Sequence, residues 1–131
     1  MNKNNDKLEI LIFEDDVVNQ KVYNILLSKS FTLSLFSSFD EYIKGNENKN
    51  YDAVIMDLGL PGSKDGIEIT KYLRDLPNFK NIPIIGVSAY AFLKDEKNAL
   101  NAGMNIFIKK PFNSDTLIKI IYALKDEKKS N

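Results

Sequence analysis

The sequence contains no cysteine, no histidine and no tryptophan. Without cysteine, the chain has no disulfides, no zinc–thiolate sites and no thiol nucleophile. Without histidine, it has no serine–histidine triad, no imidazole metal ligand and no residue that could itself carry a phosphohistidine. No apolar run approaches the ~20 residues of a membrane span, and the first residues, MNKNNDK, lack the apolar stretch of a signal peptide. We therefore expect a cytoplasmic protein without membrane contact.

An excess of either charge is absent too, because 18 lysines and arginines balance 18 aspartates and glutamates. A neutral chain gives no indication of direct nucleic acid binding. The length of 131 residues favours a single domain that can bury a proper core. We predict a disordered segment over residues 1–7, one domain over residues 8–125 and a polar tail over residues 126–131, in a monomer or weak dimer.

Short apolar runs alternate five times with segments of helical periodicity. Apolar runs without polar alternation indicate strands that are buried on both faces. This order predicts an α/β fold with a parallel five-stranded sheet, a doubly wound (βα)5 three-layer sandwich of the flavodoxin-like class, with strand order 2-1-3-4-5. The strands are expected over residues 9–13, 31–35, 53–56, 83–87 and 106–108, and helices begin near Val17, Phe39, Ile67, Leu93 and Asn113 or Ser114.

Polar side chains that can bind a metal ion or take part in a reaction follow four of these strands. Glu14 and Asp15 follow the first strand, Asp57 the third, Ser88 the fourth and Lys110 the fifth. The carboxyl ends of parallel strands share one edge, and ligands bind outside it where the strand order reverses. Asp15 and Asp57 should therefore be neighbours.

Three converging carboxylates repel one another unless a cation neutralises them. An all-oxygen site without histidine or cysteine suits Mg²⁺, or Mn²⁺ as an alternative, rather than zinc. Lys110 adds an ammonium and Ser88 a hydroxyl. Together these groups form a pocket that fits a phosphate, with a carboxylate nucleophile inside it.

The same residues carry a resemblance that covers about residues 8–125. The chain resembles response-regulator receiver domains of two-component systems and, more narrowly, those of hybrid sensor histidine kinases. The matching segments are Ile10–Asp15, Val54–Pro61, Asp65–Gly66, Pro83–Ala89, Gly103–Met104, Phe107 and Lys110–Pro111; the narrower likeness comes from Glu14–Val22, Gly103–Asn105 and Lys110–Phe112.

The resemblance implies a phosphorelay function with Asp57 as the phosphoacceptor. A histidine kinase or a histidine phosphotransfer domain would supply the phosphoryl group from a phosphohistidine, with Mg²⁺ required. Asp15 would bind the metal directly, Glu14 through water or at longer range, and Gly59 through its backbone carbonyl. The isolated domain would catalyse only its own phosphorylation and dephosphorylation, whereas a parent hybrid protein would be a histidine kinase.

The remaining roles also follow from the resemblance. Lys110 would pair with Asp57 and later with phosphoryl oxygens, and the bond before Pro111 matches a cis-proline position. Ser88 and Phe107 would switch the surface formed by the fourth helix, the fifth strand and the fifth helix. Tyr90 and Gly59 match positions that tune dephosphorylation.

Two further expectations concern ordinary structural roles. Asp16 reads as a plain cap of the first helix. The loop after Pro61 carries one residue more than the family pattern, because Gly62, Ser63 and Lys64 precede Asp65. This insertion leaves open how the loop lies over the pocket and contacts a phosphodonor.

Other functions stay open at this stage. One is a receiver-like interaction module that works without phosphorylation. A flavodoxin-like cofactor binder is disfavoured because the acids after the first strand would repel a flavin phosphate. A carboxylate-nucleophile phosphatase lacks its second aspartate, since Gly59 stands at that position. The downstream partner, and whether the chain is a stand-alone regulator or part of a hybrid kinase, are not indicated.

Overall fold

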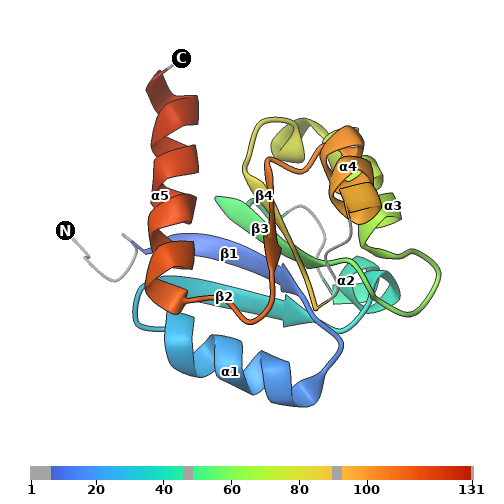
Figure 1. Cartoon of the computed structure of the whole chain (residues 1–131), viewed down its shortest axis with the longest axis horizontal. Helices are drawn as coiled ribbons and strands as arrows, with labels where there is room; N and C mark the ends of the chain where they lie inside the picture. Colours follow the sequence, from blue (N-terminus) through green and yellow to red (C-terminus); the bar gives the residue numbers. More distant parts are fainter. Residues whose placement is uncertain (1–6, 46–48, 90–92, 131) are drawn as a thin grey trace.

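The computed structural model describes residues 7–45, 49–89 and 93–130 (Figure 1). All strand pairs are parallel and the order is β2-β1-β3-β4-β5, which confirms the predicted fold. The elements are β1 (Leu8–Phe13), α1 (Val17–Leu27), β2 (Phe31–Phe36), α2 (Phe39–Gly45), β3 (Ala53–Asp57), α3 (Gly66–Arg74), the 3-10 turn η2 (Pro77–Phe79), β4 (Ile84–Ser88), α4 (Leu93–Ala102), β5 (Ile106–Lys109) and α5 (Ser114–Ser130).

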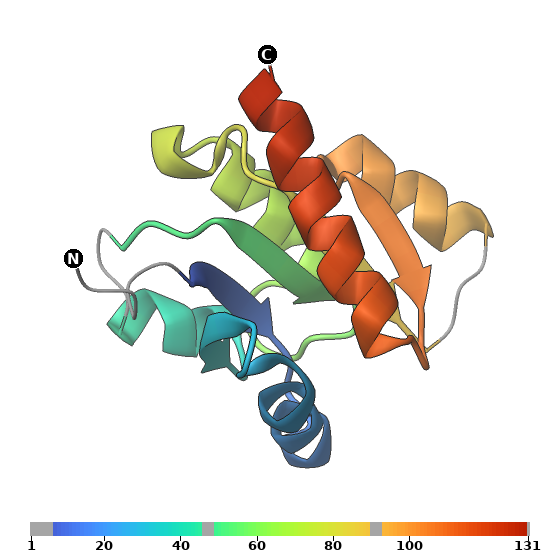
Figure 2. The same cartoon turned by 90° about the vertical axis from the view of Figure 1, so that its left-hand side faces the viewer.

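The sheet lies between two helical layers (Figures 1 and 2). Alternate residues of β1 enter different cores: Leu11 and Phe13 pack towards α2, α3 and α4, whereas Ile10 and Ile12 pack towards α1 and α5. All four side chains are fully buried. The continuous apolar sequence of β1 therefore reflects a strand that is covered on both faces.

Local signals set where several helices begin and end. The Asp16 carboxylate accepts hydrogen bonds from the amides of Val18 and Asn19, which confirms it as the cap of α1. Asp65 forms a capping box with Glu68 at the start of α3. Gly103, with φ of +119°, follows the last residue of α4.

The apolar stripe of α1 does not face the core. Val18 and Ile25 are 67% and 75% exposed, and Val22 and Leu26 are also exposed. The helix instead buries Tyr23 and Leu27 against the sheet and α5. An apolar residue every three or four positions predicted the helix correctly, but it did not identify the side that packs inwards.

The C-terminal helix α5 continues past residue 125, the predicted boundary between the domain and its polar tail. Residues 126–130, expected as a polar tail, continue α5 as far as Ser130. Lysine and glutamate have good helix propensity, so a polar composition does not stop a helix that is already formed. Residues 1–6 lie outside the described residues. None of the helices in the described parts of the chain is long and apolar enough to span a membrane.

Candidate functional site at the carboxyl edge of the sheet

The strand register brings the predicted polar residues to one edge. Phe13 of β1 pairs with Met56 of β3, so Glu14 and Asp57 follow at the same level on neighbouring strands. Ser88 at the end of β4 pairs with Lys109 of β5, and the Ser88 carbonyl accepts a 2.8 Å hydrogen bond from the Lys110 amide. Backbone pairing alone therefore gathers these residues across four strands.

Glu14, Asp15 and Asp57 form a compact acidic cluster. One carboxylate oxygen from each lies within 4.8 Å of the other two. Glu14 is buried, Asp57 is partly buried and Asp15 is exposed to solvent. This donor set fits Mg²⁺, which prefers oxygen ligands and usually keeps several water molecules. The site thus opens to solvent at Asp15 and closes at Glu14.

Lys110 is the cation of this cluster. Its Nζ lies 2.9 Å from Glu14 Oε1 and 3.1 Å from Asp57 Oδ2. The Lys110–Pro111 peptide bond is cis, as the family pattern implied. The ammonium therefore partly neutralises two of the three carboxylates.

Burial and charge act in opposite directions at this ion pair. Burial raises the pKa of the Glu14 carboxyl above its ordinary value, although the hydrogen bond from Lys110 opposes the change. Burial lowers the pKa of Lys110, but the hydrogen bond to Glu14 and the charge of Asp57 outweigh it, so its pKa is raised. Glu14 bears the larger desolvation cost because its side chain is only 1% exposed, against 19% for Lys110.

The orientation of the Asp57 carboxylate is fixed from both sides. Oδ1 accepts a 2.9 Å hydrogen bond from the Gly59 amide, and Oδ2 accepts from Lys110. Gly66 passes so close that an added Cβ would lie 2.4 Å from the Asp57 carbonyl oxygen and 2.9 Å from Leu58 Cα. Glycine is therefore required where α3 begins beside the backbone of Asp57 and Leu58.

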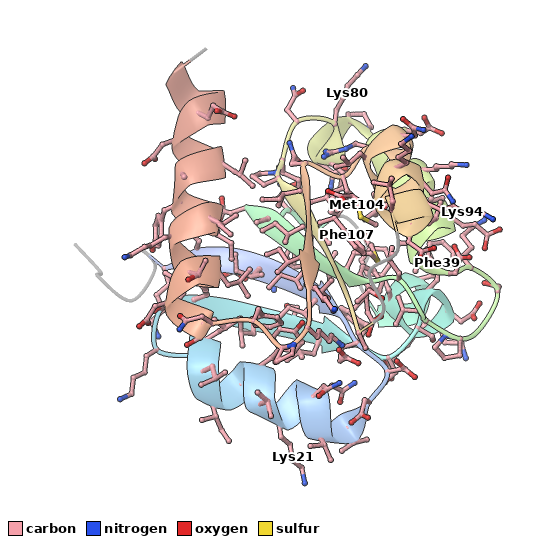
Figure 3. The ribbon with its side chains drawn as sticks, in the orientation of Figure 1. Lys21, Phe39, Lys80, Lys94, Met104 and Phe107 are labelled. Carbon is pink, nitrogen blue, oxygen red and sulfur yellow. The ribbon has the colours of Figure 1, made fainter. Side chains whose placement is uncertain are left out.

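Phe107 packs towards α4 rather than lying in open solvent. Its ring and the side chain of Met104 cover Gly86 of β4, where an added Cβ would lie 3.1 Å from Phe107 and 2.4 Å from Met104 Sδ. Figure 3 shows Met104 and Phe107 beside β5 and α4. Tyr90, predicted to modulate dephosphorylation, lies outside the described residues.

Two polar residues near the site were not singled out from sequence. Gln20 donates to the Glu14 carbonyl at 2.6 Å and to Ser37 Oγ at 3.2 Å, which joins the site to the loop before α2. Tyr23 is buried against the sheet and α5, and its hydroxyl has no hydrogen-bond partner among the described residues. Neither role has a sequence signal, because each depends on how α1 sits on the sheet.

A cavity of about 370 Å³ adjoins the ion pair between α1 and the turn after β5. Its lining is mainly apolar, although Lys110 reaches one wall. The exposed stripe of α1 continues into it through Val22 and Leu26. The lining residues are Asn19, Val22, Tyr23, Leu26, Ala89, Lys110, Pro111 and Phe112.

Comparison with known proteins gives a consistent result. The family model described as "Response regulator receiver domain" matches residues 10–122. The polar-differentiation response regulator DivK of Brucella ovis is 31% identical over 114 residues, which cover 86% of this chain and 91% of that protein.

Solved structures also superpose over nearly the whole chain. The receiver domain of a sensor histidine kinase from Pseudomonas aeruginosa, with a magnesium ion coordinated in its active site cleft, is 34% identical, with a TM-score of 0.82 over 92% of this chain and 98% of that one. A CheY-like receiver domain protein from Methanospirillum hungatei is 26% identical, with a TM-score of 0.83 over 95% and 98%.

Proposed function

The chain belongs to the response regulator receiver domain family of two-component systems, and we propose that it accepts a phosphoryl group onto Asp57 in the presence of Mg²⁺. The observation that carries the proposal is the Asp57 carboxylate, held between the Gly59 amide and the Lys110 ammonium inside an acidic cluster. A carboxylate whose two oxygens are held by an amide and an ammonium can serve as a positioned nucleophile.

In the proposed reaction, an Asp57 oxygen forms a bond to phosphorus as the phosphorus–nitrogen bond of a phosphohistidine breaks. The leaving imidazole keeps the electron pair of that bond and takes up a proton. The Lys110 ammonium donates to Asp57 before the reaction and is close enough to donate to the phosphoryl oxygens afterwards. Phosphoryl transfer needs mainly positioning and charge stabilisation, which this cluster provides.

Asp15, Asp57 and the Gly59 carbonyl are the groups that would hold the metal. Glu14 is less suited to direct coordination, because its side chain is only 1% exposed and pairs with Lys110 at 2.9 Å, whereas Asp15 is exposed to solvent. We assign it a role through a metal-bound water. When bound, Mg²⁺ would neutralise the acids and screen the incoming phosphoryl oxygens from Asp57; Mn²⁺ has the same ligand preference.

Ser88 and Phe107 are proposed to pass the change to the surface formed by α4, β5 and α5. Ser88 supports the idea by its place beside Lys110 at the end of β4. Phe107 supports it by packing against Met104 and Gly86 at the base of α4. Phosphorylation would bias an equilibrium between two packings of this surface.

A phosphohistidine that donates to Asp57 must lie on a second protein or domain, because this chain has no histidine. The exposed stripe of α1 and the cavity beside Lys110 offer an apolar contact surface next to Asp57. We propose a histidine kinase or histidine phosphotransfer domain as the donor. The receiver acts either as a stand-alone regulator or as part of a hybrid kinase, and the gene sequence around it distinguishes the two.

Acetyl phosphate with MgCl₂, followed by intact mass spectrometry, tests the proposal. The expected result is an adduct of ~80 Da that requires the metal and is absent from Asp57→Asn. Asp15→Asn should raise the Mg²⁺ concentration needed for labelling. A native protein without an adduct would instead favour an interaction module that works without phosphorylation. An adduct that survives Asp57→Asn would show that another residue accepts the phosphoryl group.

A further inference from the structure

The extra length of the loop after Asp57 lies against the start of α2. The Asp40 carboxylate accepts two hydrogen bonds from Ser63, one from the amide at 3.2 Å and one from the hydroxyl at 2.9 Å. The Nζ of Lys64 lies 5.5 Å from the centre of the Phe39 ring. Figure 1 shows this loop passing beside α2, and Figure 3 marks Phe39 at the same corner.

Gly62 makes this contact close. Its φ is +99°, a conformation that other residues rarely adopt, and an added Cβ would lie 2.9 Å from Asp40 Oδ2. The backbone of the loop therefore comes directly against the Asp40 carboxylate. Three consecutive residues, Gly62, Ser63 and Lys64, contact α2 through different interactions.

The base of the loop has further contacts close to Asp57. Gly59 donates to Asp57, Leu60 is buried in the core, and the Gly66 amide donates to the Leu58 carbonyl at 3.4 Å. The outer part, residues 61–64, contains three exposed residues, Pro61, Gly62 and Ser63. The Asp40–Ser63 contact thus restrains the rim of the site rather than Asp57 itself.

We propose that Asp40 and Ser63 are specificity-determining residues for protein phosphodonors, because their contact holds the rim of the site in one conformation. The inference rests on the proposed phosphotransfer to Asp57. A donor protein must bring its phosphohistidine over this rim, whereas a small donor needs to reach only Asp57. A rim that is already ordered lowers the entropic cost of docking a protein surface.

The test compares two donors on the same variants. Initial rates of phosphorylation are measured with acetyl phosphate and with a set of phosphorylated histidine phosphotransfer domains, first on the wild-type chain. A domain that labels the wild-type chain is then used on the variants. The variants are Asp40→Asn, Ser63→Ala and the double variant, and Ser63→Thr keeps the hydroxyl. Ser28→Ala and Asp75→Asn, which change the same groups at the exposed C-terminal ends of α1 and α3, are matched controls.

We expect both single variants to slow transfer from the protein donor roughly tenfold through a raised KM, with acetyl phosphate rates unchanged. The double variant should be slowed by less than the product of the two single effects, because both substitutions weaken the same contact. Ser63→Thr should behave as wild type. Thermal unfolding of each variant shows that it is folded at the assay temperature.

Three results would overturn the inference: unchanged transfer from the protein donor, equal slowing with both donors, or labelling by acetyl phosphate but by no protein donor. A wild-type chain that neither donor labels would instead contradict the proposed function itself. The two failures are therefore distinguishable in one set of assays.

Discussion

Lys110 Nζ lies 2.9 Å from Glu14 Oε1, although 96 residues separate the two in sequence. The contact joins the end of β1 to the turn after β5 above the strands that lie between them. Because the Glu14 side chain is 1% exposed, its charge depends on this partner. The ion pair therefore fixes the geometry of the site before any phosphoryl group arrives.

Removing the Lys110 ammonium should lower the stability of the fold. Lys110→Met leaves Glu14 buried without its cation, next to a second carboxylate, Asp57. We expect the free energy of unfolding without metal to fall by about 3 kcal/mol, as measured by urea denaturation at neutral pH. Adding Glu14→Gln to Lys110→Met should recover much of the loss, since no buried charge then remains unpaired. Lys109→Met, at the exposed neighbour, is the control; an equal loss there would contradict a specific ion pair.

The Asp40 carboxyl should titrate below its ordinary pKa of 3.8. The hydrogen bonds from the Ser63 amide and hydroxyl favour the charged form most, and the charge of Lys44 adds to them. Because the pKa is lower in the folded state, this contact stabilises the fold above pH 3.8 and is lost as the pH falls through the folded-state value. Carbon-13 NMR of the carboxyl group measures it. Ser63→Ala should raise the pKa towards 3.8, and no change would argue against the contact in solution.

Tyr23→Phe should leave stability unchanged or increase it by about 1 kcal/mol. The hydroxyl is buried and finds no hydrogen-bond partner in the part of the chain that the structure describes, so removing it abolishes a desolvation cost and leaves the ring in place. Burial, followed by the charges of Glu14 and Asp57, raises the pKa of the phenol, so the effect should not vary between pH 6 and pH 8. Thermal and urea unfolding measure it, with exposed Tyr122→Phe as the control. A clear destabilisation would show that the hydroxyl has a partner in solution.

Arg74, the only arginine, should resist replacement even by lysine. Its guanidinium donates to the carbonyls of Phe79, Ile82 and Gly103 at 2.7–2.9 Å and to Asn105 Oδ1 at 2.8 Å. A lysine ammonium cannot match this planar arrangement. Arg74→Lys should lower the free energy of unfolding by about 2 kcal/mol, against less than about 0.5 kcal/mol for exposed Lys71→Ala. Equal effects would show that the carbonyl contacts contribute little.

The sequence was informative where a short segment and the general geometry of a parallel sheet determine where a residue lies. The buried runs of β1 and β3, and the acids that follow them, placed Glu14, Asp15 and Asp57 together, because parallel strands share a carboxyl edge. Asp16 marked the start of α1 through local backbone chemistry.

Features that depend on packing between elements were not predicted. The stripe containing Val18 and Ile25 had helical spacing, but Tyr23 and Leu27 face the core instead, because the position of α5 and the turn after β5 determines which side fits. The contact between Asp40 and Ser63 joins residues 23 positions apart, and neither residue has a signal of its own. The role of Arg74 likewise depends on carbonyl groups from other segments of the chain, which no local sequence pattern indicates.

Phosphorylation of Asp57 is tested most directly by locating the phosphoryl group in the chain. The chain is phosphorylated with acetyl phosphate and Mg²⁺ and reduced with borohydride, which converts an aspartyl phosphate to homoserine. Peptide mass spectrometry then identifies the altered residue. We expect homoserine at position 57 and nowhere else, dependent on metal and phosphodonor. Homoserine at Asp15 or Asp16, or an unaltered Asp57 in a labelled protein, would contradict this expectation.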